Sequence, residues 1–259
     1  MSKTQNIKLA VDAVVFGYQN NQLYVLLIKQ KFGIAKGKWS LPGGFVLNDE
    51  SLTQAVEREL QEEAGIKVNY LEQLYTFGDD VKRDPRNHTV TVAYFALVNP
   101  KKWTLKADTD AEDAQWFPII NDQVVQALPD TEPSTERRVL SGVEVSRSAK
   151  AIKLAYDHKK IIKVGVERLK GKLTYQPIGF DLLDKEFPFS DLEHLYGTIL
   201  GKEIDRRNFR KKMLSFDILQ ETKKMKKVGS GRPAKLFTFN KQKYSALVKE
   251  GFHFEIKYV

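Results

Sequence analysis

The chain has 259 residues, 42% of them hydrophobic and 29% charged, with no cysteine and a formal net charge of +9 at pH 7. This composition supplies apolar side chains for one large or two small globular domains and argues against a disordered chain. The missing cysteines exclude a disulfide scaffold, cysteine-based zinc sites and thiol catalysis. No segment approaches the roughly 20 apolar residues of a membrane span, and the polar residues 1–6 lack a signal-peptide core, so we expect a cytoplasmic protein.

The positive charge is concentrated toward the end of the chain. Residues 151–259 carry 24 Lys and Arg against 13 Asp and Glu, a net +11, whereas residues 1–150 carry 18 against 20, a net −2. Within the basic part, residues 205–235 hold 11 basic and 3 acidic side chains, a net +8. A charge run can simply be a solvated surface, but an excess this segregated favours an anionic partner, with nucleic acid the first candidate.

The first part of the chain reads as alternating strands and helices. Short apolar runs at 11–16 and 23–28 predict two strands joined by a turn at Asn20-Asn21. Helical periodicity follows, then two further strands and a closing Trp-Phe-Pro; these lie at 52–64, 71–77, 89–97 and 116–118. A Pro-rich linker at 128–135 then separates two expected domains, residues 1–140 and 141–259.

The second part reads as helices followed by a hairpin. We expect a helix from about 148 to 169, and a capping box at residues 190–193 that begins the next helix. The buried stripe of that helix would be Leu192, Leu195, Tyr196 and Ile199. Gly201 would end it and Asp205 would cap a further helix. The inward face of that helix would consist of Phe209, Met213 and Phe216.

The segment 44–66 carries the strongest chemical signal. On a helix, Glu59, Glu62 and Glu63 lie at i, i+3 and i+4 and converge on one face. Such carboxylates repel one another unless a cation compensates them, and Mg²⁺ or Mn²⁺ prefers oxygen ligands. Arg58 lies four residues before Glu62 and can orient or neutralise one carboxylate. On spacing alone, an exposed acidic helix face is the alternative.

The wider pattern resembles the Nudix box. Its defining positions are Gly44, Glu50, Arg58-Glu59-Leu60, Glu62-Glu63 and Gly65-Ile66. The resemblance covers roughly residues 8–125 and implies an α/β/α sandwich that cleaves pyrophosphate bonds with divalent ions. By position it implies Glu59, Glu62 and Glu63 as metal ligands together with the Gly43 carbonyl, and Arg58 as a further member of the catalytic constellation. The general base stays open between a box glutamate and Glu112.

Three further residues are candidates for ligand contact. Trp39 is suited to stack on a base or ribose, although a core position is the alternative. Arg83 and Arg86 lie near a turn and are suited to hold a pyrophosphate, with a plain surface loop as the alternative.

The basic end predicts a winged helix-turn-helix in an α+β domain. Its second helix offers polar side chains suited to the major groove, namely Arg206, Arg207, Asn208, Arg210 and Lys211. A run of lysines then leads into the segment 229–235, where Arg232 and Lys235 are placed to contact the backbone or the minor groove.

Together the two halves resemble the Nudix-related transcriptional regulator (NrtR) family. The resemblance rests on the motifs at residues 75–79, 83–86, 206–212 and 231–236 and covers nearly the whole chain. It implies a bacterial dimeric regulator that binds operator DNA, senses ADP-ribose or a related nucleotide-sugar metabolite, and controls genes of NAD metabolism. Because the box is complete, two alternatives remain: a Mg²⁺-dependent ADP-ribose pyrophosphatase, and a protein that is both hydrolase and regulator.

Overall fold

The computed structural model describes residues 6–108, 110–126, 137–140, 143–146, 151–227, 233–256 and 258. The chain divides into two compact units, Met1–Arg168 and Leu169–Val259. The linker expected at 128–135 lies outside the described residues. Within the described part, no helix is both long and apolar enough to cross a membrane.

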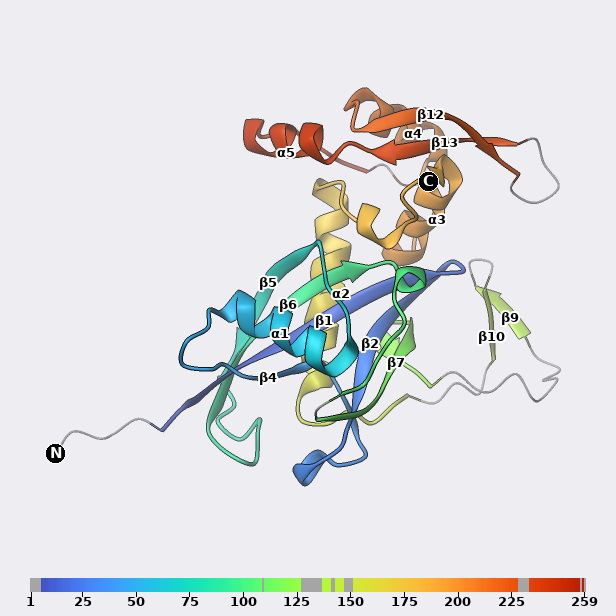
Figure 1. Ribbon diagram of the computed structural model, residues 1–259. Coiled ribbons are helices and arrows are strands. Elements are labelled where there is room, and N and C mark those ends of the chain that lie inside the picture. Colours follow the sequence, from blue (N-terminus) through green and yellow to red (C-terminus); the bar gives the residue numbers. More distant parts are fainter. Residues whose placement is uncertain are drawn as a thin grey trace. The chain divides into compact units, whose positions relative to one another are not determined.

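The first unit is built on a mixed sheet (Figure 1). Its strands are β1 (Lys8–Gln19), β2 (Gln22–Gln30), β3 (Trp39–Ser40), β4 (Gly43–Phe45), β5 (Leu71–Phe77), β6 (Thr89–Val98), β7 (Ala111–Ile120) and β8 (Gln123–Val124). They follow the order β5-β6-β1-β2-β7-β8, with β3 beside β2 and β4 beside β1. Strands β1 and β6 run parallel, and the other described pairs of this sheet are antiparallel. A separate hairpin consists of β9 (Arg137–Leu140) and β10 (Val143–Ser146).

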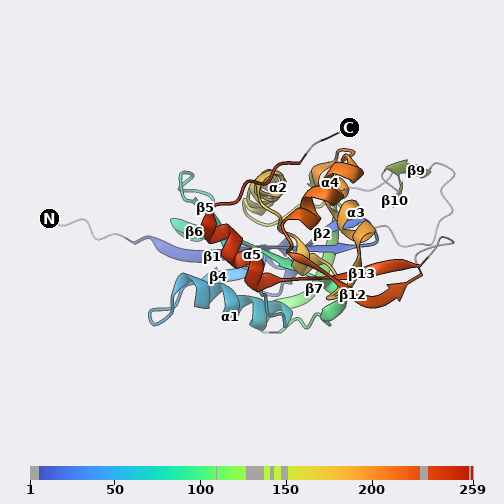
Figure 2. The same cartoon turned by 90° about the horizontal axis from the view of Figure 1, so that it is seen from above.

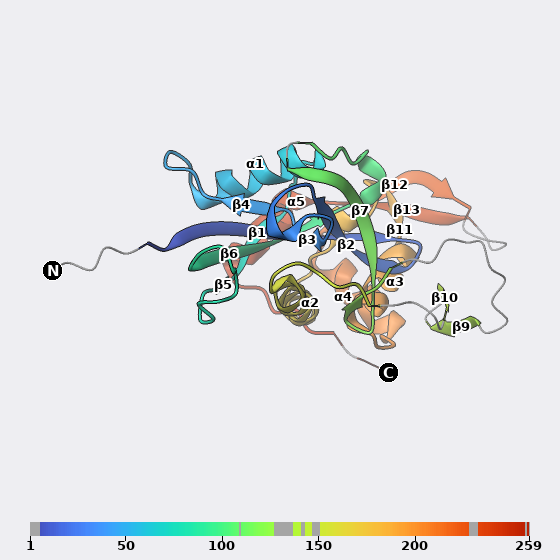
Figure 3. The same cartoon turned by 90° about the horizontal axis from the view of Figure 1, so that it is seen from below.

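Helices cover both faces of this sheet (Figure 3). The helical segments of the unit are η1 (Gly33–Ala35), α1 (Leu52–Ala64), η2 (Pro100–Lys102) and the first turns of α2 (His158–Tyr175). Ala13 and Val15 belong to the apolar cluster under α1. Their neighbours Val14 and Phe16 point the other way and meet α2 at Gly165, where a Cβ would lie 3.1 Å from Val14. Strand alternation thus builds the expected α/β/α sandwich.

Local signals determine the ends of these elements. The predicted turn forms at Asn20 and Asn21, whose φ angles of 49° and 56° suit a tight hairpin. Helix α1 spans the predicted residues: the Ser51 hydroxyl accepts from the Gln54 amide at its start, and Gly65 ends it at φ 68°.

The helix expected from about residue 148 begins only at His158, so that prediction is wrong at its start. Long-range contacts hold the preceding residues in an irregular path. The Ala155 amide donates to the Trp39 carbonyl at 2.8 Å, and Leu154 forms an isolated bridge with Trp39. The first turns of α2 belong to the first unit, so the division at Arg168 lies later in the chain than the boundary expected at 140.

The second unit combines helices with a three-stranded sheet (Figure 2). Its elements after α2 are η3 (Phe180–Leu182), β11 (Phe187–Pro188), α3 (Phe189–Leu200), α4 (Arg206–Ser215), β12 (Leu219–Lys226), β13 (Ala234–Phe239) and α5 (Lys241–Glu250). The sheet order is β11-β13-β12. The predicted α3 stripe is buried, and the Tyr196 hydroxyl donates to the Ile178 carbonyl at 3.0 Å.

The helix ends of this unit follow the sequence in part. Gly201 ends α3 at φ 63°, and the Asp205 side chain accepts from the Asn208 amide at the start of α4. Phe209 and Met213 are buried as expected, and Phe216 is half-buried. The capping box at 190–193 is wrong, because α3 already begins at Phe189. The preceding strand β11 pairs with β13, and this pairing decides where α3 starts.

Candidate functional site

A pocket of about 240 Å³ opens in the first unit. Strand β1, the β4 turn, α1, the loop after β5 and the start of α2 all contribute to it. Its ionisable lining comprises Asp12, Glu59, Glu63, Arg83, Asp84, Arg86, Asp110, Tyr156 and His158. Positive and negative side chains therefore share one cavity, a composition that suits an anionic ligand accompanied by a cation.

Arg58 organises the carboxylates of the box. Its guanidinium donates to Glu50 at 2.7 and 2.9 Å, to Glu59 at 2.8 Å and to Glu62 at 3.2 Å. These hydrogen bonds and the Leu47 amide lower the pKa of Glu50 to about 2. The side chain of Glu62 is 43% exposed, so Arg58 holds it at the edge of the site.

Glu59 and Glu63 are buried at the floor of the pocket. The Gly43 amide donates to Glu63 Oε2 at 2.8 Å. A Cβ on Gly44 would lie 2.2 Å from Glu59 Oε1, so only glycine leaves room for that carboxylate. Burial raises the pKa of Glu59, and it raises the pKa of Glu63 to about 9.

The donor chemistry of this floor fits a hard divalent cation. Two buried carboxylates whose pKa values are raised lack a positive partner strong enough to keep both charged. Their oxygens are the ligands that Mg²⁺ and Mn²⁺ prefer. Within the described residues, however, no three His, Asp or Glu side chains converge so as to hold a metal ion, and Glu62 is turned to Arg58.

Both arginines expected to contact a ligand line the pocket, and both are paired with carboxylates. Arg83 is buried and donates to Asp157 at 2.7 and 3.0 Å. Arg86 donates to both oxygens of Asp84 at 2.8 to 3.2 Å. Its guanidinium lies 4.9 Å from the ring centroid of Tyr156. An anionic ligand must compete with these carboxylates.

His158 joins the start of α2 to the pocket. Its Nδ1 accepts from the Leu41 amide at 2.8 Å, and its Nε2 lies 3.5 Å from Asp12 Oδ1. Burial lowers the pKa of His158, so the imidazole is neutral and its Nε2 carries the proton.

The structure does not bring every candidate to the pocket. Trp39 packs edge-to-face on Phe117 at 4.7 Å and is not part of the lining. Glu112 pairs with Lys29 at 3.2 Å at the surface, whereas Asp110 of the same loop lines the cavity. Sequence reasoning also missed four other lining residues, Asp12, Asp84, Tyr156 and His158. Asp84 was signalled by its place between the two arginines, but nothing local marked the others.

The second candidate surface is the polar side of α4. Arg206, Arg207, Asn208, Arg210 and Lys211 are all exposed. Asn208 also donates its side-chain amide to Asp205. Lys235 on β13 pairs with Glu221 at 2.6 Å, and both side chains are about half exposed. Arg232 lies outside the described residues.

Arg210 differs from its neighbours because it stacks on the core. Its guanidinium carbon lies 4.5 Å from the ring centroid of Phe189 and 5.7 Å from that of Phe237. This cation–π arrangement fixes the planar group at the edge of the helix. Arg207, one turn earlier, stays a candidate for direct base or phosphate contact.

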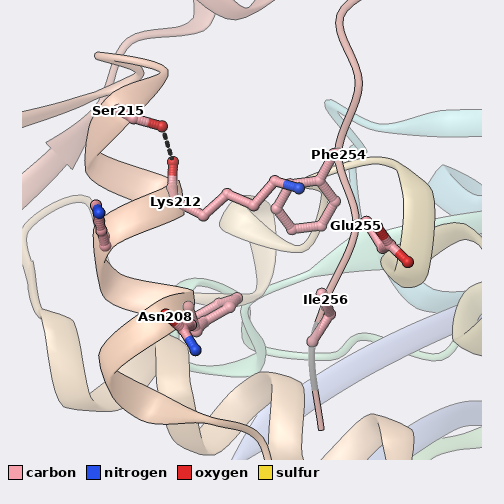
Figure 4. Close-up of a pocket in the computed structure, with 8 residues that line it drawn as sticks. Asn208, Lys212, Ser215, Phe254, Glu255 and Ile256 are labelled. Atoms are coloured by element: carbon pink, nitrogen blue, oxygen red, sulfur yellow. Dashed lines mark hydrogen bonds between the residues drawn. The ribbon is translucent and has the colours of Figure 1, made fainter.

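The chain after α5 lies along one side of α4 and leaves a cavity of about 250 Å³ (Figure 4). Lys212 extends toward Phe254, with its Nζ 5.8 Å from the ring centroid. Phe216 meets Phe252 and Phe254 at 5.1 and 5.9 Å. This segment therefore packs on α4 and leaves Arg206 and Arg207 outside the cavity lining.

Comparison with known proteins finds a separate family model for each part of the chain. The NUDIX domain model matches residues 7–139, and the NrtR DNA-binding winged helix domain model matches residues 179–239. An ADPR responsive transcriptional repressor, NtrR, of Acinetobacter baylyi is 32% identical over 238 residues, covering 91% of this chain and 83% of that protein. An ADP-ribose pyrophosphatase of Methanocaldococcus jannaschii is 34% identical over 157 residues, covering 60% of this chain and 70% of that protein.

A solved structure agrees over both domains. The crystal structure of Shewanella oneidensis NrtR complexed with a 27mer DNA matches with a TM-score of 0.72 and 29% identity, covering 96% of this chain and 99% of that chain. Nudix relatives generally use divalent metal ions. The chain belongs to the NrtR family, in which a Nudix domain is joined to a DNA-binding winged helix domain.

Proposed function

We propose that this protein is a DNA-binding transcriptional regulator that senses ADP-ribose or a related nucleotide-sugar metabolite through its Nudix domain. The observation that supports the proposal is the similarity to an ADPR responsive repressor, which extends over 91% of the chain and across both domains. Such a regulator works in the cytoplasm, and genes of NAD metabolism are its expected targets.

The exposed basic residues of α4 are the proposed contact with duplex DNA. Arg206, Arg207, Asn208 and Lys211 offer donors of the kind that read base edges or bind phosphates. Arg210 of the same helix, Lys235 of β13 and Arg232 complete the candidate set. A homodimer would place two such helices on half-sites about one helical turn, or a multiple of it, apart.

The pocket of the first unit is the proposed sensor site. Arg83 and Arg86 provide two guanidinium groups for a pyrophosphate. Trp39 is not part of the pocket lining, whereas Tyr156 and Phe45 both line it and both lie against the Arg86 guanidinium. We therefore favour Tyr156 and Phe45 over Trp39 as the aromatic surfaces nearest the ligand.

Hydrolysis is a second candidate function, favoured by the complete box and the two buried carboxylates. Glu59 and Glu63 would hold a divalent cation, with Glu62 able to join them if it leaves Arg58. A bound cation would stabilise the charge of a pyrophosphate and activate water. Arg58 would position Glu59 and Glu62, and the Gly43 turn would shape the cation site. Both Mg²⁺ and Mn²⁺ suit these ligands.

One experiment addresses both functions. The full chain is incubated with duplex DNA from the region upstream of its own gene, with and without ADP-ribose and Mg²⁺, while DNA binding and AMP release are followed together. A regulator binds the duplex and changes its affinity with ADP-ribose. Absence of DNA binding in every condition would overturn the regulator, and AMP release reports hydrolysis independently.

A further inference from the structure

The segment Tyr156–His158, which we name the sensor segment, links the pocket to the start of α2. All three of its residues touch pocket groups. Tyr156 lies against the Arg86 guanidinium, Asp157 binds Arg83, and His158 accepts from the Leu41 amide. A ligand that moves these pocket groups would therefore change contacts of the residues at which the chain enters α2.

The chain continues through α2 from the first unit into the second. The helix begins at His158 and ends at Tyr175, while the division between the units falls at Arg168. Its first turns are fixed on the sheet at Gly165, and Arg168 donates to the Leu74 carbonyl at 2.9 Å. Helix α2 is thus the covalent connection between the sensor segment and the DNA-binding domain.

The backbone of the sensor segment is held in an unfavourable conformation. Tyr156 has a φ of 49°, in the left-handed region that bulky residues rarely adopt. Conformations of this kind persist only where surrounding contacts enforce them. The Arg83–Asp157 ion pair is one of those contacts.

Asp157 has two competing roles. Its carbonyl accepts from the Lys160 amide at 2.8 Å, so it stands at the capping position of α2. Aspartate at that position ordinarily uses its carboxylate to accept the free amides of the first turn. Here both carboxylate oxygens are instead engaged by Arg83. If Arg83 is withdrawn, the carboxylate can instead accept from the first-turn amides, of which the Lys160 amide now donates to the Asp157 carbonyl and the His158 amide to the Ala155 carbonyl.

A pyrophosphate is the ligand group that would withdraw Arg83. The guanidinium faces the pocket, and its bidentate geometry suits phosphate as well as carboxylate. The same ligand would meet Arg86, whose guanidinium also lines the pocket and lies 4.9 Å from the ring centroid of Tyr156.

We propose that the Arg83–Asp157 ion pair is a latch, opened when a ligand phosphate binds Arg83, and that the freed Asp157 then caps α2 and changes the DNA affinity of the winged helix domain. The inference rests on the proposed function, since it explains how an anionic ligand acts at a distance. Regulation of this kind requires that the ligand bind one arrangement of the latch better than the other.

The test uses the full chain and the Asp157→Asn variant, with ADP-ribose as the ligand. Calorimetry gives the ADP-ribose affinity, and fluorescence anisotropy gives the affinity for upstream duplex DNA with and without saturating ADP-ribose. The ratio of the two DNA affinities measures the coupling. We expect the variant to bind ADP-ribose at least as tightly as the wild type. Its ratio of DNA affinities should be closer to 1 than the wild-type ratio by a factor of about five or more.

The matched control is Glu167→Gln, which removes the same charge from α2. Glu167 forms an exposed pair with Lys163 at 3.9 Å, and such pairs contribute little to stability. Its ratio should equal that of the wild type. If Asp157→Asn fails to fold, Asp157→Ser removes the same ion pair with a smaller side chain and leaves Arg83 intact, and its ratio at saturating ADP-ribose must also move toward 1.

The outcomes separate the latch from the proposed function. If ADP-ribose changes the DNA affinity of the wild type and the Asp157→Asn variant has the same ratio as the wild type, the latch alone is overturned. Loss of ADP-ribose binding in Asp157→Asn also overturns it, because Asp157 would then position Arg83 for the ligand rather than compete with it. A wild type that binds DNA but does not respond to ADP-ribose overturns the sensor function and the latch with it.

Discussion

Arg58 holds Glu50 through two hydrogen bonds, from Nε to Oε2 at 2.9 Å and from Nη2 to Oε1 at 2.7 Å. The same guanidinium reaches Glu59 and Glu62, so one cation ties the loop before α1 to two carboxylates of the helix. The carboxylates of the box are thereby preorganised by the protein itself.

The Glu50 pair predicts a pH dependence of stability. Because the pKa of Glu50 falls from 4.5 to about 2 on folding, its contribution is present above pH 4.5 and is lost as the pH falls toward 2. Glu50→Gln should therefore lower the Tm at pH 7, and its difference from wild type should shrink between pH 4.5 and 2. Calorimetric unfolding across this range measures the difference. The exposed Glu57→Gln on α1 is the control, and a Glu50→Gln difference independent of pH would contradict the assignment.

Arg207 and Arg210 should weaken DNA binding for different reasons. Arg207→Ala removes an exposed charge, so the log–log salt slope should fall in magnitude by about 0.9 while the Tm stays unchanged. Arg210→Ala should also lower stability by about 0.5–1 kcal/mol, because it removes the contacts with Phe189 and Phe237. The double variant should not bind the operator. Anisotropy titrations at several salt concentrations and thermal unfolding separate the effects, and unchanged binding by the double variant would exclude α4 as the contact.

Arg86 should determine ligand affinity. Its guanidinium lines the pocket, so Arg86→Ala should weaken ADP-ribose binding by about tenfold or more through loss of a charge-assisted contact. Calorimetric titration measures the change. Lys82→Ala is the matched control, since Lys82 is exposed in the same loop and is not part of the lining. Equal losses in both variants would point to a general charge effect rather than a site.

Glu62 and Glu63 test the hydrolase directly. If the wild type releases AMP from ADP-ribose with Mg²⁺, Glu62→Gln and Glu63→Gln should each reduce the rate by about 100-fold or more, because metal activation of water is lost. Glu57→Gln, exposed on the same helix, should keep the wild-type rate. AMP release is measured by chromatography. Undiminished rates in both variants would show that neither carboxylate takes part in hydrolysis.

The sequence alone determined the elements whose signals are local. Helix α1 and strand β5 span the residues predicted for them, and Gly201 and Asp205 mark helix ends as expected. In each case the deciding contacts lie within a few residues, as between Ser51 and Gln54. The box and the segregated charge likewise indicated the two domains before any coordinates.

Only the tertiary structure decided the contacts between distant segments. The start of α2 moved to His158 because Trp39 holds Leu154 and Ala155 before it and the Leu41 amide binds His158 itself. The start of α3 moved because β11 pairs with β13. Arg210 stacks on Phe189, 21 residues away, rather than standing free, and the ion pair of Arg83 with Asp157 spans 74 residues. Such pairings leave no periodicity or spacing in the sequence, since folding alone brings these side chains together.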